Sequence, residues 1–121
     1  MNKSDAQKSI LNEEEAIERF GGEIELYEEI LSMFVNEPQF SLNEVQEYII
    51  KGRSTEAASC VHRLKGTAGT IGADKLYKAA SDAESVLRSK TEGNIDALLV
   101  QVSKYYTEAE NFIRMRMNKH S

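Results

Sequence analysis

The chain has 121 residues, of which 40% are hydrophobic and 29% charged, with one proline and no tryptophan. This length suits one hydrophobic core, and the composition excludes a disordered or collagen-like chain. No apolar run reaches the ~18 residues of a membrane span, and the N-terminus lacks a signal peptide's apolar stretch, so we expect a cytoplasmic protein without membrane insertion. The single cysteine, Cys60, excludes an intramolecular disulfide and a cysteine-rich metal site.

The charge is negative and unevenly distributed. The net charge of -5 argues against nucleic acid as a partner, because binding to phosphate backbones needs a concentrated basic surface. Residues 1–37 carry ten acidic and three basic side chains, whereas residues 38–121 carry ten and twelve. An acidic N-terminal part followed by a slightly basic part indicates a protein partner. The alternative is that these charges belong to ordinary solvated helix faces.

Helical spacing of apolar residues dominates the chain, and no stretch alternates as a half-buried strand does, so we predict an all-α protein. Asn12, Ser54 and Asn94 are expected N-cap residues, and Pro38 suits the first turn of a helix. The expected helices cover about residues 13–20, 23–36, 38–52, 54–71, 74–89 and 94–117.

The last four of these helices are joined by short loops, which predicts an up-and-down antiparallel four-helix bundle. Its core covers about residues 38–117, and the two additional N-terminal helices pack on it as a cover. We expect one domain over residues 12–118, preceded by a loose segment over residues 1–11. Arg114, Arg116, Lys119 and His120 belong to a polar C-terminal segment that is expected to be disordered.

The helix expected over residues 54–71 has two contrasting faces. Its core face collects apolar residues within an arc of about 100°. His62, Lys65, Gly66 and Gly69 lie on an arc nearly opposite, so His62 faces away from the core. Each helical glycine costs about 1 kcal/mol relative to alanine, and nothing in the predicted packing requires either one.

An outward-facing glycine one turn from an imidazole suits a group that must approach the helix backbone closely. Lys65, on the same face, offers a cation to an anion attached at His62. The pattern predicts an exposed nucleophile at His62, a cation at Lys65 and a helix surface free of side chains at the glycines. An ordinary surface histidine is the alternative.

The corner at Gly72-Ala73 suggests a partner for the histidine. If the helices on either side run antiparallel, residues equidistant from Ala73 lie level, which pairs His62 with Glu84. A carboxylate there accepts the Nδ1 proton and leaves Nε2 free to attack. The alternative, an ordinary glutamate at the edge of the core, stays open because the register is inferred.

The segment from His62 to Ala73, HRLKGTAGTIGA, together with Leu76 and Glu84, resembles the signature of the histidine-containing phosphotransfer (HPt) domain family. The upstream Phe20-Gly21-Gly22, followed by Leu26, Leu31 and Phe34, is similar to that family's N-terminal region. The resemblance therefore covers nearly the whole chain.

The resemblance implies a phosphoryl carrier of a multistep two-component relay, whose partners are response-regulator receiver domains and a sensor or hybrid histidine kinase. His62 matches the phosphorylated histidine, Lys65 the lysine that steadies the phosphoryl group, and Gly66 the glycine that leaves room for it. Some family members carry glutamine at the position of Glu84. We further expect Arg63 and Gly69 to belong to the surface on which the partner docks.

The sequence contains no phosphate-cradling loop, nucleotide motif or evident carboxylate cluster for magnesium. We therefore expect no cofactor on this chain, with magnesium and most of the catalytic apparatus on the partner receiver, and we expect a monomer. Two other functions remain open. One is a docking module that is never phosphorylated, and the other is an enzyme in which His62 and Glu84 form an acid–base pair.

Overall fold

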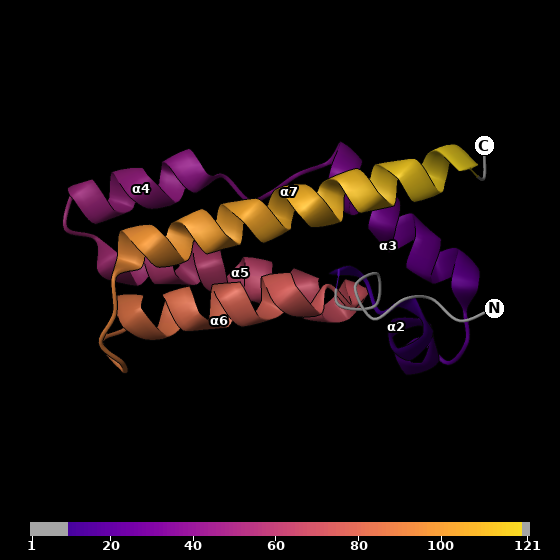
Figure 1. The fold of residues 1–121 in the computed structure, drawn as a ribbon, viewed down its shortest axis with the longest axis horizontal. Coiled ribbons are helices and arrows are strands. Elements are labelled where there is room, and N and C mark those ends of the chain that lie inside the picture. Colours follow the sequence, from indigo (N-terminus) through magenta and orange to yellow (C-terminus); the bar gives the residue numbers. More distant parts are fainter. Residues whose placement is uncertain (1–9, 120–121) are drawn as a thin grey trace.

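The computed structural model describes residues 10–119, and this part of the chain folds into helices without a strand (Figure 1). The all-α prediction is therefore confirmed for the described residues. None of their helices is both long and apolar enough to cross a membrane. The helices are α2 (Glu13–Arg19), α3 (Ile24–Asn36), α4 (Leu42–Ile50), α5 (Ser54–Ile71), α6 (Asp74–Leu87) and α7 (Ile95–Lys119).

The centre of the fold is formed by α5, α6 and α7, with α6 packed against both of the others. Alanines occupy many buried positions of α5 and α6, so these helices meet over small side chains. Helix α7 contributes a longer apolar stripe, and Asn94 caps its start because Oδ1 accepts the Ala97 amide at 3.1 Å. Lys75, in the first turn of α6, reaches Glu108 in the second half of α7, so these helices run antiparallel.

Helices α3 and α4, which come directly before α5 in the chain, lie toward opposite ends of α7 (Figure 1). Helix α4 packs on α5, whereas α3 packs on α7 and also contacts α2 and α5. The ring of Tyr106 on α7 lies 5.2 Å from the ring of Phe34 and 5.6 Å from that of Phe40, which fixes the connection between α3 and α4. Four long helices were expected over residues 38–117. The structure has three, α5, α6 and α7, and α4 has only nine residues.

Several predicted helix ends were wrong. Pro38 is not helical, because α4 begins four residues later behind the extended Ser41, whose hydroxyl accepts the Glu44 amide at 3.3 Å. Ser54 is the first residue of α5 rather than its cap, because Arg53 takes the N-cap position. Ser89 has a left-handed backbone, with φ of 59°, and lies beyond the end of α6.

The chain ends are more ordered than expected where they are described. Leu11 is fully buried, although residues 1–11 were predicted to be loose. Arg114 and Arg116 belong to α7, which agrees with the helix expected over residues 94–117 and not with a disordered C-terminal segment. The Arg116 guanidinium pairs with Glu13 and Glu28. Residues 1–9 and His120 lie outside the described residues.

The corner between α5 and α6 depends on Gly72. Its φ of +84° is left-handed, which ends α5 and lets the Ala73 amide reach the Ala68 carbonyl at 2.9 Å. The Gly72 carbonyl accepts the Asn12 amide at 2.7 Å, so the segment before α2 is tied to the same corner. A Cβ atom on Gly72 would lie 2.5 Å from the Asn12 carbonyl oxygen. This corner therefore requires glycine for its conformation and for space.

Replacement of Gly72 by alanine is expected to lower the free energy of unfolding by about 1–3 kcal/mol, because the side chain adds backbone strain and a clash. The control is Gly66→Ala, at a helical glycine where a Cβ would meet no atom within 4 Å. That variant should be as stable as the wild type or more stable by about 0.5–1 kcal/mol. Urea unfolding measures both, and a Gly72→Ala protein as stable as wild type would contradict this account of the corner.

Candidate functional site

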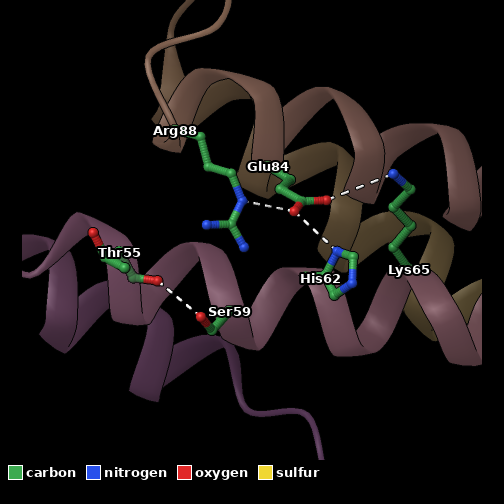
Figure 2. Close-up of polar contacts among 6 residues, drawn as sticks. All are labelled: Thr55, Ser59, His62, Lys65, Glu84 and Arg88. Carbon is green, nitrogen blue, oxygen red and sulfur yellow. Dashed lines mark hydrogen bonds and ion pairs between the residues drawn. The ribbon is translucent and has the colours of Figure 1, made fainter.

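The histidine site lies on the outer face of α5, where the neighbouring α6 runs alongside (Figure 2). The His62 side chain is 61% exposed, which agrees with the prediction that it faces away from the core. Gly66, one turn further on, is exposed and leaves open space where a side chain would be. Ser59, one turn earlier, directs its hydroxyl to the Thr55 carbonyl at 3.1 Å and not to the histidine (Figure 2).

The predicted pairing of His62 with Glu84 is present in the structure. The His62 Nδ1 atom lies 2.9 Å from Glu84 Oε2, and the glutamate side chain is only 11% exposed. A carboxylate has no proton to donate, so the hydrogen in this bond belongs to Nδ1. The second ring nitrogen, Nε2, points away from Glu84 (Figure 2), and in the neutral ring it is the nitrogen that carries the lone pair. The contact thus selects the tautomer whose exposed nitrogen is nucleophilic.

Two cations surround the same carboxylate. Arg88 donates from Nε to Glu84 Oε2 at 2.8 Å, and Lys65 Nζ lies 3.6 Å from Oε1. Arg88 was not predicted from the sequence, although it follows Glu84 by four residues, the spacing of side chains that meet on a helix. One carboxylate and two cations leave a net positive charge beside the histidine, in a chain whose overall charge is negative.

The surroundings of Glu84 affect its protonation. Burial alone would raise the pKa of this carboxyl group, but the hydrogen bonds from Arg88 and His62 and the positive charge of Lys65 outweigh it. The pKa of Glu84 therefore lies below its ordinary value. The group is a carboxylate at neutral pH, as the hydrogen bond with Nδ1 requires.

The two glycines on this face of α5 have different surroundings. Gly66 is open, whereas Gly69 lies under the ring of Tyr77 from α6, so a Cβ there would stand 3.3 Å from Cδ2. Gly69 thus has a close packing contact that was not expected from the sequence, whereas Gly66 has none. Gly69 was also expected on the surface where the partner docks, but the Tyr77 ring covers part of it and leaves less of it accessible to a partner.

A cavity of about 550 Å³ lies on another side of α5. Its walls come from α3, the connection after it, α5 and Tyr106, and they include Met33, Phe40 and Arg63. Gly66 also borders the cavity, but His62, Lys65 and Glu84 do not. The exposed imidazole therefore stands beside this hollow and not inside it.

Cys60 is buried next to the same cavity. Burial and the hydrogen bond to Glu44 raise the pKa of its thiol, so the structure places it as a small residue of the core. Among residues 10–119, no group of three or more histidine, cysteine or acidic side chains is placed to hold a metal ion. The positive charge at the site comes from Lys65 and Arg88.

The lowered pKa of Glu84 predicts a pH-dependent contribution to stability. Because the folded state favours the carboxylate, this contribution is present above the ordinary pKa of glutamate and is lost as the pH falls through the lower folded pKa. Glu84→Gln keeps the shape but removes the charge, so wild type should be the more stable at neutral pH. The difference should shrink in acid, as measured by urea unfolding over a pH series.

Glu92→Gln, in the exposed turn after α6, controls for the general loss of one acidic group. A difference between wild type and Glu84→Gln that stays constant or grows toward low pH would contradict the assigned direction of the pKa shift.

Comparison with known protein families assigns most of this chain to one family. The model of the family described as "Hpt domain" matches residues 29–112, which is more than half of the chain and includes the whole of α4, α5 and α6. Neither the curated proteins nor the solved structures contain a match to this chain. Hpt domains are helical bundles that serve histidine phosphotransfer in phosphorelays. On the family match, supported by the helical fold, the chain belongs to the Hpt domain family.

Proposed function

We propose that this protein is the phosphoryl carrier of a multistep two-component relay, with His62 as the phosphorylated residue. Nε2 accepts the phosphoryl group from a receiver aspartate, or from a kinase, and passes it to the aspartate of a response regulator. The observation that carries the proposal is the 2.9 Å contact of Nδ1 with the Glu84 carboxylate, which leaves Nε2 exposed as the nucleophile.

The transfer step requires no loss of a proton from this chain. The Nε2 lone pair attacks the phosphorus of an aspartyl phosphate, forming an N–P bond while the P–O bond to the aspartate breaks. The aspartate leaves as a carboxylate with the electron pair of that bond. The ring keeps its proton on Nδ1 and becomes cationic, and the Glu84 carboxylate stabilises this cation. Transfer to the next aspartate reverses these bond changes.

Lys65 and Gly66 are proposed to serve the phosphoryl group itself. The Lys65 ammonium already stands beside the histidine, 3.6 Å from Glu84 Oε1, and is available to balance the negative oxygens of an attached phosphoryl group. The open space above Gly66 gives an incoming aspartyl phosphate access to the ring from that side. Positioning and charge stabilisation are the main needs of phosphoryl transfer.

The partner is proposed to supply the rest of the catalytic apparatus, including magnesium. The reacting ring is exposed on the surface of α5, so it needs a second protein to exclude water. Arg63, three residues from Gly66 and on the wall of the neighbouring cavity, is proposed to contact the docked receiver. On this proposal the protein is a carrier rather than an enzyme with its own substrate pocket.

The arrangement of the helices suits a carrier. We assign α4 to α7 to the antiparallel up-and-down bundle that displays His62, with α2 and α3 as its cover. One exposed site on this bundle needs no second copy of the chain, so a monomer is proposed, in the cytoplasm with its relay partners.

The proposal predicts that His62→Gln abolishes phosphoryl uptake and leaves the fold intact, because the side chain lies outside the core. The measurement follows labelled phosphoryl groups from a phosphorylated receiver domain to this chain in the presence of magnesium. His120→Gln replaces the other histidine of the chain and should take up label as wild type does. Uptake retained by His62→Gln would disprove the assignment, and a docking module that is never phosphorylated would leave wild type unlabelled.

A further inference from the structure

We infer that Tyr77 is a positioning residue for Lys65, and that Gly69 is glycine because the tyrosine ring must lie on it. The inference rests on the proposed function of His62. It gives a role to Tyr77 and Gly69, which have no role in the transfer step proposed above. It joins two observations: Gly69 is covered by the Tyr77 ring, and the same ring faces the Lys65 ammonium.

The first step is the placement of the ring. Gly69 and Tyr77 lie four residues on either side of Ala73, so the antiparallel register that pairs His62 with Glu84 also sets these two level. An added Cβ at Gly69 would stand 3.3 Å from Cδ2 and 3.4 Å from Cε2 of the ring, closer than side chains ordinarily approach. The missing side chain therefore lets the ring lie against the backbone of α5. Tyr77 remains 42% exposed in this position, so burial in the core does not account for it.

The second step is the contact with lysine. Lys65 Nζ lies 5.6 Å from the centre of the Tyr77 ring, within the range of a cation–π interaction. The same atom lies 3.6 Å from Glu84 Oε1, and the Lys65 side chain is only 27% exposed. The ammonium thus interacts with both the ring and the carboxylate.

The third step concerns what this placement achieves. A free lysine side chain samples many rotamers, and restricting it costs conformational entropy whenever it must bind an anion. Here the side chain is already confined near the ring of His62 before any phosphoryl group arrives. Less ordering remains for the transfer step, which is the usual advantage of a preorganised charge.

The test compares Tyr77→Leu, which removes the aromatic face, with Tyr77→Phe, which keeps it. Uptake at His62 from phosphoramidate, a small donor that needs no docking, should slow by about two- to five-fold in Tyr77→Leu, the range expected for an exposed cation–π contact. Tyr77→Phe should restore the wild-type rate. In a Lys65→Ala background, Tyr77→Leu should cause no further loss, because the two residues act through one contact.

Tyr105→Leu is the matched control. Tyr105 on α7 also faces two lysines, Lys75 and Lys104, but neither of them contacts Glu84. Its replacement removes comparable cation–π contacts elsewhere and should leave the uptake rate at His62 unchanged. A slowing in Tyr105→Leu equal to that in Tyr77→Leu would assign the effect to general packing and overturn the inference.

A second readout uses the unphosphorylated protein. The methylene protons next to Lys65 Nζ should have NMR signals shifted by the ring current of Tyr77, and this shift should disappear in Tyr77→Leu and persist in Tyr77→Phe. Unchanged Lys65 signals and an unchanged uptake rate in Tyr77→Leu would overturn the inference while leaving the carrier function intact. Failure of wild type to take up phosphate would instead refute the proposed function, and the NMR comparison would still test the lysine placement.

Discussion

The hydrogen bond between Glu84 and His62 is the interaction on which the rest of the site depends. Glu84 is nearly buried between two helices, and a buried carboxylate is stable only when hydrogen-bonded and balanced by charge. Arg88 and Lys65 provide that balance and keep the group ionised. Because it is ionised, it can only accept, so the histidine must donate from Nδ1. In the neutral ring the exposed nitrogen, Nε2, is therefore the basic one.

The register between α5 and α6 brings these partners together, and the corner at Gly72 sets that register. A turn of two residues with one left-handed glycine leaves little freedom in how the two helices align. Two pairs follow from this register: His62 contacts Glu84 farther from the corner, and Gly69 contacts Tyr77 nearer to it. The Asn12 amide donates to the Gly72 carbonyl, and the Tyr27 hydroxyl donates to the Ile71 carbonyl. The N-terminal helices therefore stabilise this corner. The cover thus contributes to the site through the corner, without contacting the histidine.

Much of this arrangement could be predicted from the sequence. Apolar periodicity, together with capping residues, Pro38 and the glycines at helix ends, located all the described helices to within a few residues. The helical wheel of residues 54–71 placed His62 outside the core. The register argument found Glu84, because it needs only the position of the turn. The same argument, applied nearer the corner, would have found Tyr77 beside Gly69. Arg88 could have been found from its spacing to Glu84 on one helix.

Other features could not be predicted because they depend on tertiary contacts or on which of several local caps forms. Pro38 fits a helix start, but residues 38–41 are not helical: Phe40 packs on Tyr106, and Ser41 caps α4. The helix expected over residues 94–117 includes Arg116, but its spacing does not show that this side chain is largely buried between Glu13 and Glu28, which are far away in sequence. The meeting of Lys65 with both Glu84 and Tyr77 depends on side-chain rotamers, which periodicity does not describe.

The most direct test of the central claim is to determine which ring nitrogen carries the phosphoryl group. The chain is labelled with ¹⁵N at histidine, phosphorylated through a receiver domain, and examined by NMR for coupling between phosphorus and each ring nitrogen. The account predicts phosphorus on Nε2 of His62, with Nδ1 still protonated and bonded to Glu84. Phosphorus on Nδ1, or on neither nitrogen of His62, would contradict it.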